Sequence, residues 1–461
     1  MKMSSRKRGR EPDTGEKVIT KKRKLVGLPN LGNTCFFNAT LQILAHTKGL
    51  LSHLQRKEKR KYEIQCKSKV LTVEVGDGDR PLTDALCAFL ATFEKGNPKM
   101  IRTTLKELYK QIENKYERFQ HNEQQDSAEL LRCLLDGIRK EEIKAVKKVV
   151  EKQISEEEND EISEAEKKLL LKEAQKLATK VKTPIDDLFG GAVLNTVICR
   201  ECLEPIQLVE PFLDVCVPIP DEGSCCFEHH HYPDYDDPET NKAENPKLLQ
   251  ELLQSHGMHV RLTKEPSSTS VDDLEQCLKE HTSLDVLDDD NKFICQKCTA
   301  DRKSDTGHDE YAECLVSKQL LFHSLPSFLI VNIKRFHLGQ IVTKNNRHIK
   351  FPSSVNIAPF CSDACQKYCT GEEDKKIMYS LYGVVEHSGT LFSGHYSARV
   401  KLPSSTDSTE QPSSSTSLKS EVEGQYSDET TEEWCLASDS SARLTDIDEV
   451  LSSQAYLLFY E

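Results

Sequence analysis

The chain has 461 residues, of which 30% are charged and 37% are hydrophobic. This length suits one large elaborated domain or two to three smaller ones, and the polar composition predicts long solvated insertions. No apolar run approaches the roughly 18 residues that span a bilayer, and the first residues lead into no apolar signal segment. We therefore expect no membrane partner and an intracellular location, in the nucleus, the cytoplasm or both.

Residues 1–26 form a basic tail without apolar periodicity, and we expect this tail to be disordered. Residues 1–24 carry ten Lys or Arg against three Asp or Glu, a charge of 10 − 3 = +7, within a chain whose net charge is −13. The basic residues form two clusters, 6–10 and 21–24, with the spacing of a bipartite nuclear-import signal. An import receptor is therefore the expected partner, with a merely solvated tail as the alternative; nucleic-acid binding is not the expected role.

The next segment, residues 27–44, presents a cysteine at the start of a predicted helix. Asn33 and Thr34 are good helix-capping residues directly before Cys35, and apolar residues with helical spacing follow it. The amide groups and dipole of a helix N-terminus lower a thiol pKa, which makes Cys35 a candidate nucleophile. The Asn30 side chain could stabilise an oxyanion together with the Cys35 backbone N–H.

Two helical segments follow. Residues 124–135 begin with polar residues and continue with leucines at helical spacing. Residues 140–182 are highly charged and carry two apolar stripes on either side of an acidic break, which predicts a helical hairpin or an extended arm inserted into the fold.

The seventeen cysteines are an odd number in a chain with no visible secretory signal, which indicates a reducing compartment where thiols serve metal binding and catalysis. Cys199 with Cys202 and Cys295 with Cys298 form two C-x₂-C pairs. Four such thiolates favour a closed, structural Zn²⁺ site, and a ribbon that has lost its metal is the alternative. Between the pairs, residues 221–270 are acidic and irregular.

From residue 327 the pattern changes to short β-branched and aromatic runs, which predict strands at 328–333, 379–385, 396–400 and 455–460. His395 stands at the start of one of these runs, after a glycine. Residues 403–433 are rich in Ser, Thr and Glu and should form a disordered loop. Helices early and strands late indicate an α+β fold with an antiparallel sheet.

Five segments in this order resemble the ubiquitin-specific protease family, which are papain-like cysteine deubiquitinases. The matching segments are 27–44, 124–131, 325–336 with 351–352, 379–389 with 393–396, and 455–460. The pattern particularly resembles ubiquitin-specific proteases sixteen and forty-five. Only about 26 residues precede the match, so we expect their N-terminal zinc finger to be missing.

The resemblance implies one catalytic domain over residues 27–461, with a helical thumb, a β-rich palm and β fingers. The fingers would span residues 190–320 and carry the zinc ribbon. The expected activity is thiol-dependent hydrolysis of the isopeptide or peptide bond at the C-terminal glycine of ubiquitin, with ubiquitin and ubiquitinated proteins as partners and no catalytic cofactor.

The resemblance also assigns catalytic roles. His395 would be the general base that accepts the Cys35 proton and later protonates the leaving amine. The residue that orients the imidazole follows the single tryptophan, where this chain has Ser438 and then Asp439. Either Ser438 serves as a weaker orienting residue or Asp439 takes over this role.

Substrate contacts follow from the same matches. Gln124 and Asp126 would bind the C-terminal tail of ubiquitin, with Asp126 accepting from an arginine, although both residues could simply cap the helix that follows. Tyr396 would line the passage for the terminal Gly-Gly, and His387 would support the site near this tail.

Two other functions are compatible with the motifs. A ubiquitin-binding scaffold with little activity is one, supported only by the uncharged Ser438. A protease for another ubiquitin-like modifier is the other, because its tail channel would look alike.

Overall fold

The computed structural model describes residues 25–55, 59–76, 80–120, 123–156, 163–220, 251, 253–258, 272–287, 291–306, 311–338, 342–368, 376–390, 393–403 and 432–461. The basic clusters of the predicted tail lie outside these residues, as do most of segment 221–270 and nearly all of segment 403–433. None of the helices in the described part of the chain is both long enough and apolar enough to cross a membrane.

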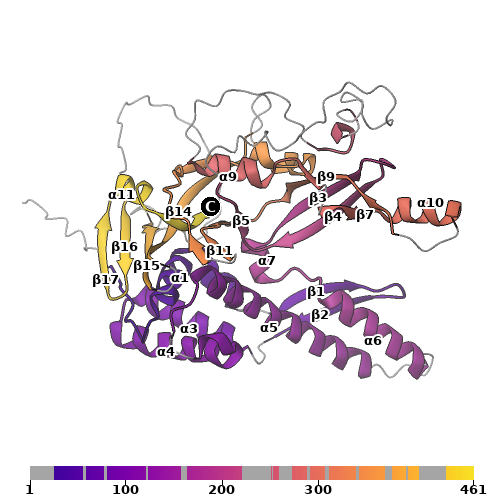
Figure 1. Cartoon of the computed structure of the whole chain (residues 1–461). Coiled ribbons are helices and arrows are strands. Elements are labelled where there is room, and N and C mark those ends of the chain that lie inside the picture. The colour runs from indigo at the N-terminus through magenta and orange to yellow at the C-terminus, as the bar shows by residue number, and fades with distance from the viewer. Residues whose placement is uncertain are drawn as a thin grey trace, which may run out of the picture.

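A sheet of eight strands forms the centre of the molecule (Figure 1). Its strand order is β17-β16-β15-β14-β18-β10-β5, with β13 paired to β14, and the pairs are antiparallel except for β10 with β5. The strands are β5 (Val215–Val217), β10 (Leu329–Ile333), β13 (Ser354–Asn356), β14 (Met378–Gly389), β15 (Gly394–Lys401), β16 (Trp434–Ser438), β17 (Ser441–Thr445) and β18 (Ala455–Tyr460). The predicted late strands are thus confirmed, and so is the α+β class.

Strand β18 shows why this sheet forms. All six of its residues are buried, with Leu457 and Phe459 packed in one apolar cluster and Leu458 and Tyr460 in another. A continuous apolar run of this kind suits a strand that is covered on both faces.

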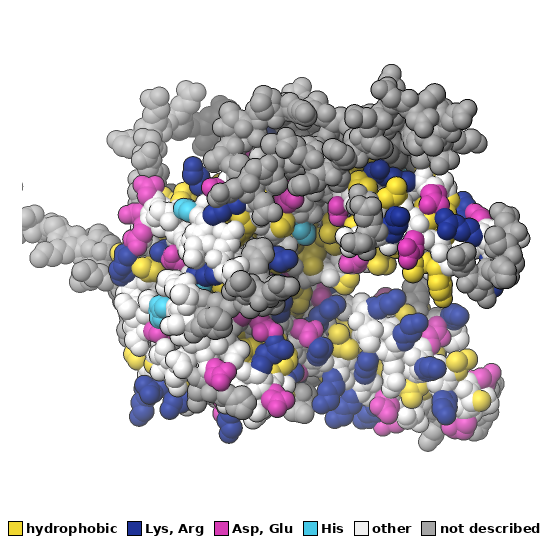
Figure 2. All heavy atoms as spheres, viewed as in Figure 1, with side chains coloured by type: hydrophobic (Ala, Val, Ile, Leu, Met, Phe, Trp, Pro, Cys, Tyr) yellow, Lys and Arg dark blue, Asp and Glu magenta, His cyan; other side chains and the backbone are white. Residues whose placement is uncertain are grey.

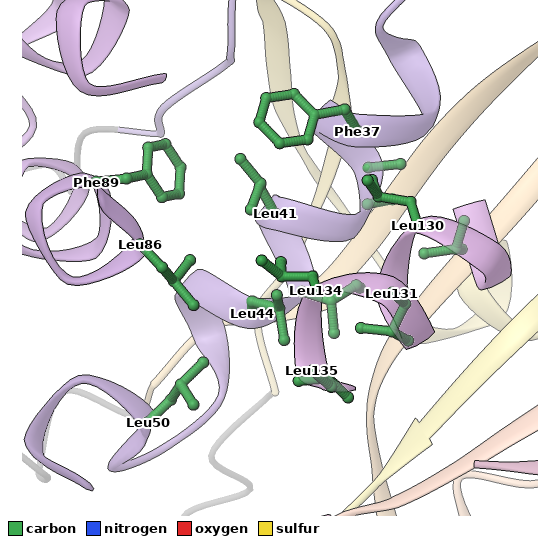
Figure 3. Close-up of a cluster of buried hydrophobic side chains, with 14 of the residues drawn as sticks. Phe37, Leu41, Leu44, Leu50, Leu86, Phe89, Leu130, Leu131, Leu134 and Leu135 are labelled. Atoms are coloured by element: carbon green, nitrogen blue, oxygen red, sulfur yellow. The ribbon is translucent and has the colours of Figure 1, made fainter. Parts of the chain in front are cut away.

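The first cluster joins the sheet to a layer of helices (Figures 1 and 3). Figure 3 shows Phe37, Leu41 and Leu44 of the first helix pointing toward the leucines of α5 and toward Leu86 and Phe89 of α3. The helices of this layer are α1 (Cys35–His46), α2 (Leu50–Leu54), α3 (Pro81–Lys95), α4 (Pro98–Lys115), α5 (Ser127–Ser155) and α7 (Pro184–Phe189). Caps set several of the starts, as at α4, where the Asn97 side chain accepts from the Lys99 and Met100 amides.

The fingers are a four-stranded sheet in the order β4-β3-β9-β6, extended by the small β7–β8 sheet and by α10. Their elements are β3 (Gly191–Cys199), β4 (Pro205–Phe212), β6 (Asp285–Leu287), β7 (Phe293–Ile294), α10 (Gln296–Thr306), β8 (Glu313–Cys314) and β9 (Val316–Ser324). Helix α9 (Leu274–His281) packs near β5. The hairpin of β11 (Phe336–Leu338) and β12 (Val342–Lys344) lies beside the eight-stranded sheet, which is the palm. Helix α11 (Ile447–Leu451) precedes β18.

The predicted helical insertion is part of an arm with a core of its own. Helix α5 continues to Ser155 and packs against α6 (Glu164–Ala178), and both contact the hairpin β1 (Arg60–Gln65) and β2 (Val70–Val75). The buried residues of this separate cluster include Val146, Val150, Ile154 and Ala174. The sequence predicted the helices, but not the hairpin that covers them.

The arm and the fingers project on the same side of the molecule, with open space between them in the view of Figure 2. In this view Lys and Arg side chains gather over the arm. Strand β4 of the fingers exposes Ile206 and Leu208.

Because the arm has its own apolar cluster, it should lose stability independently of the catalytic core. Ile154 is 3% exposed in this cluster, so Ile154→Ala should weaken the local packing by about 2–5 kcal/mol. Hydrogen exchange should accelerate in β1, β2, α6 and the end of α5 and stay unchanged in β14 and β15. The exposed Lys148→Ala on the same helix is the matched control. Equal acceleration in β14 and β15 would show that the arm is not a separate unit.

Candidate active site

Cys35 is the first residue of α1 and is buried at 3% exposure. Its thiol lies against the backbone N–H of Tyr396, the residue after His395 on β15. The structure therefore brings the predicted nucleophile onto the segment that carries the predicted base.

The resting thiol does not have the lowered pKa that we expected from a helix N-terminus. Burial raises the pKa of Cys35, and the Asp439 carboxylate raises it further. The amide hydrogens of Tyr396, Phe36 and Cys35 itself lower it in part. Since desolvation disfavours the thiolate, the described residues favour a neutral thiol until a proton acceptor is engaged.

The structure distinguishes the two candidates for the orienting residue by position. His395 Nε2 lies 2.8 Å from Ser438 Oγ, which is a hydrogen bond between adjoining strands. This contact leaves Nδ1 as the ring nitrogen available to the thiol. Ser438 thus occupies the place beside the imidazole, with a neutral hydroxyl where a carboxylate would add negative charge.

Asp439 contacts the helix side of the site instead. Its two carboxylate oxygens accept from Asn30 Nδ2 at 2.9 Å and from Asn38 Nδ2 at 2.7 Å, and its backbone carbonyl accepts from the Leu28 amide at 2.7 Å. Asp439 reaches this position with a φ of +47° in the turn between β16 and β17, a left-handed conformation that aspartate tolerates. The turn therefore joins the segment before α1 to the sheet.

Asn30 is held at both ends of its amide. Its Oδ1 accepts from the Gly32 amide at 2.8 Å, while its Nδ2 donates to Asp439. The segment before α1 lies so close to the β16–β17 turn that position 27 requires glycine. A Cβ there would lie 2.3 Å from the carbonyl oxygen of Ser440. The contacts with Asp439 and Gly32 thus fix the orientation of the Asn30 side-chain amide.

Asn38 is a site residue that the sequence interpretation missed. Besides Asp439, its side-chain amide approaches the carbonyls of Leu28 at 3.3 Å and Pro29 at 3.4 Å. Asn38 is 2% exposed, but Thr40 and Gln42 of the same helix are polar and equally buried, so the sequence carried no signal that singled Asn38 out.

Gln124 lies across the site from the helix layer to β15. Its Nε2 donates to the Gly394 carbonyl at 3.0 Å, and its Oε1 accepts from the Gly394 amide at 3.1 Å. Gln124 thus uses both ends of its side chain on the residue before His395, and it does not cap α5.

Asp126 does cap α5, since its Oδ1 accepts from the Glu129 amide at 2.9 Å. Its Oδ2 accepts from Tyr456 Oη at 2.6 Å, a partner on β18 that the sequence interpretation missed. Burial raises the pKa of Asp126, although the Tyr456 hydroxyl, the Ala128 amide and the Arg132 charge lower it in part. Asp126 therefore caps the helix, as the alternative interpretation expected. An arginine of the substrate would have to share one of its two carboxylate oxygens with an existing hydrogen-bond donor.

His387 and Tyr396 form the aromatic side of the site, with ring centroids 4.5 Å apart. Burial, the Lys344 ammonium and His395 lower the pKa of His387 to about 4, so its ring is neutral at pH 7. Lys344 donates to the carbonyls of His387 and Gly389, both at 2.9 Å. Burial raises the pKa of Tyr396, which keeps its phenol neutral as well. The rings of His387 and Tyr396 thus form an uncharged aromatic surface next to His395.

The predicted metal ligands come together at the tip of the fingers. Cys199 Sγ lies 3.8 Å from Cys298 Sγ, and Cys202 Sγ lies 3.6 Å from Cys295 Sγ. Sulfur atoms about 2.3 Å from a tetrahedral Zn²⁺ would be about 3.8 Å from one another. The donor set therefore fits the metal. A fifth cysteine that the sequence interpretation did not include, Cys314, lies in the same cluster.

Comparison with known proteins identifies the family to which this chain belongs. Residues 26–460 match the family model described as ubiquitin carboxyl-terminal hydrolase. The chain is 27% identical to ubiquitin carboxyl-terminal hydrolase 16 of Danio rerio, an alignment that covers 94% of this chain and 74% of that protein. It is 25% identical to ubiquitin carboxyl-terminal hydrolase 45 of Homo sapiens, over 94% and 76% of the two chains.

Solved structures show the same fold. The SAGA Ubp8/Sgf11/Sus1/Sgf73 DUB module bound to ubiquitin aldehyde contains a chain that aligns with a TM-score of 0.55 at 19% identity, covering 95% of this chain and 69% of that one. A form of this module bound to monoubiquitin aligns with a TM-score of 0.54 at 19% identity, over 96% and 72% of the two chains. These similarities confirm the predicted fold of thumb, palm and fingers.

The two neighbouring residues at the turn should have separable effects on catalysis. Ser438→Ala removes one neutral hydrogen bond worth about 0.5–1.5 kcal/mol, so kcat/KM on a fluorogenic ubiquitin substrate should fall about twofold to tenfold. Asp439→Ala removes charge-assisted bonds to Asn30 and Asn38, worth about 1.5–3 kcal/mol each, and should cost more.

A charged replacement provides the matched control. Ser438→Asp should stabilise the imidazolium, so the acid-side rise of kcat/KM, which needs the free imidazole as general base, should move to a higher pH than in the wild type. If Ser438→Ala lost more activity than Asp439→Ala and Ser438→Asp left the pH profile unchanged, the two residues would not have the roles that their contacts indicate.

Proposed function

Because the chain belongs to the ubiquitin carboxyl-terminal hydrolase family and is a cysteine-type deubiquitinase, we propose that Cys35 and His395 carry out its reaction. The reaction is hydrolysis of the bond that follows the C-terminal glycine of ubiquitin in a conjugate. The observation that supports this assignment is the Cys35 thiol against the backbone N–H of Tyr396, the residue after His395, whose imidazole contacts Ser438 through Nε2.

Each residue has one proposed step. His395 Nδ1 takes the proton of the Cys35 thiol as the sulfur attacks the glycine carbonyl carbon. The imidazolium then gives this proton to the leaving lysine nitrogen as the C–N bond breaks, which leaves an acyl-enzyme. Water attacks the thioester with His395 as the base, and the Cys35 thiol is restored.

The oxyanion that forms in both steps accepts from the Cys35 backbone N–H and from Asn30 Nδ2. Asn30 is suited to this role because Asp439 and the Gly32 amide fix its side-chain amide before substrate binds. A donor fixed in advance stabilises developing charge without reorganisation at the moment of reaction.

Ubiquitin is the proposed partner, and its tail runs between the helix layer and β15. Gln124, Asp126, His387 and Tyr396 border this path. Because Gln124 already bonds to Gly394 through both ends of its amide, the tail replaces one or both of these bonds when it enters. The globular part of ubiquitin then lies against the exposed apolar residues of β4.

The cysteine cluster of the fingers is a structural Zn²⁺ site in this proposal. Cys199, Cys202, Cys295 and Cys298 provide four sulfur donors, and the Cys199–Cys298 and Cys202–Cys295 separations of 3.8 and 3.6 Å are close to those around a tetrahedral ion. When bound, the ion would crosslink β3 to the start of α10. No catalytic step depends on it.

The location of the protein in the nucleus, the cytoplasm or both is a proposal from sequence alone. Its support is the spacing of the basic clusters 6–10 and 21–24, which suits recognition by a nuclear import receptor.

A ubiquitin probe with an electrophile at its C-terminus tests the proposed function. The wild-type chain should form one covalent adduct at Cys35, and Cys35→Ala should abolish it. His395→Ala should slow adduct formation by at least about 100-fold, since general-base assistance contributes typically 10²–10⁴-fold. Cys87→Ala, which changes a partly buried thiol in the middle of α3, is the matched control and should react like wild type.

Probes made from other ubiquitin-like modifiers complete the experiment. Faster capture of one of these than of ubiquitin would contradict the substrate assignment. Tight binding of the ubiquitin probe without any adduct would contradict the catalytic roles and favour the scaffold alternative.

A further inference from the structure

The tip of the fingers holds five cysteines, one more than a tetrahedral metal ion can bind. The sulfur atoms of Cys199, Cys295, Cys298 and Cys314 all lie within 4.8 Å of one another, and all four residues are buried. Cys202 belongs to the cluster through its 3.6 Å contact with Cys295. The Cys298 thiol interacts with each of the other four.

Two different sets of four thiols can therefore surround one ion. The set with Cys202 contains the two C-x₂-C pairs. Its Cys199–Cys298 and Cys202–Cys295 separations, 3.8 and 3.6 Å, suit opposite edges of a tetrahedron of sulfur atoms around zinc. In the set with Cys314, all four cysteines are buried and shielded from solvent. The two sets share Cys199, Cys295 and Cys298.

The two thiols that differ between the sets are held in different ways. Cys202 is only partly buried, and the residue after it, Leu203, has a left-handed φ of +58° in the turn between β3 and β4. Cys314 is fully buried on β8, where it pairs with Phe293 of β7. The amide of Cys295 also donates to the Ala312 carbonyl at 3.0 Å. The backbone thus fixes Cys314 beside the Cys295–Cys298 knuckle without help from a metal.

We propose that Cys314 is an alternate metal ligand that replaces Cys202 when the Cys202 thiolate is lost. This inference rests on the proposed zinc site. In the exchange the Cys314 sulfur forms the bond to the ion as the Cys202 bond breaks. The proton of the Cys314 thiol passes to the departing Cys202 thiolate, so the charge of the site does not change. In a chain without Cys202 this proton passes to solvent.

The consequence is a metal site that tolerates the loss of its most exposed ligand. A buried cysteine usually serves as a small apolar residue, and Cys314 would then leave a three-sulfur site when Cys202 is removed. A ligand role predicts four sulfur donors in the same variant. The number of sulfur donors therefore distinguishes the two roles.

The test compares the full-length wild type with Cys202→Ser, Cys314→Ser and the double variant. Each chain is assayed for bound zinc and, after exchange with Co²⁺, for the intensity of the thiolate-to-cobalt charge-transfer band. Wild type and both single variants should hold one zinc and give the intensity of four sulfur donors. The double variant should lose about a quarter of this intensity, because four donors become three, and should release zinc more readily.

The double variant Cys202→Ser with Cys277→Ser is the matched control. Cys277 is buried in the palm, in a different cluster, so this variant should still give four donors. Cys202→Ser by itself decides the question if the double variant fails to fold.

Two negative results have separate meanings. If the wild type binds zinc but Cys202→Ser gives the three-donor intensity, the exchange is wrong and the ordinary four-cysteine site stands. If the wild type binds neither zinc nor Co²⁺, the proposed zinc site itself is wrong, and the exchange falls with it.

Discussion

The contacts of Asp439 with the segment before α1 are the constraint on which the active site depends. The helix layer carries Cys35, whereas the sheet carries His395 and Ser438, and the two layers are far apart in sequence. Asp439 accepts from Asn30, Asn38 and the Leu28 amide within one turn. Through the pairing of β15 with β16, the same turn fixes the strand of His395. The Cys35 thiol, the proposed oxyanion donor Asn30 and the proposed base His395 therefore share one anchoring point.

This arrangement divides two tasks between adjacent residues. Ser438 belongs to β16 and bonds to the imidazole, whereas Asp439 turns in the left-handed conformation and bonds to the asparagines. The negative charge thus lies on the side of the oxyanion donor and of the thiol, where it raises the pKa of Cys35. The described residues therefore favour a neutral resting thiol, and the hydroxyl beside the imidazole adds no negative charge.

Much of this site could be predicted because it is encoded in short segments. The segments around Cys35 and His395 resemble motifs of the ubiquitin-specific protease family, and the two C-x₂-C pairs have a spacing that favours zinc. The contacts that were missed depend on partners distant in sequence. Tyr456 of β18 meets Asp126, the β1–β2 hairpin covers α5 and α6, and Cys314 joins the metal cluster without a C-x₂-C spacing. The choice between Ser438 and Asp439 depended on the exact end of β16, which composition does not define.

Chemical crosslinking tests whether the side chains of Cys35 and His395 lie within reach of one small reagent. 1,3-Dibromoacetone alkylates a reactive thiol and can then alkylate a nitrogen within reach of the same small reagent. We predict a single bridge between Cys35 and His395 Nδ1, found by peptide mapping of the native chain, and no bridge in Asp439→Ala, where the anchoring point is lost. Alkylation of Cys35 without attachment to His395 in the native chain, or a bridge to a different histidine, would contradict it.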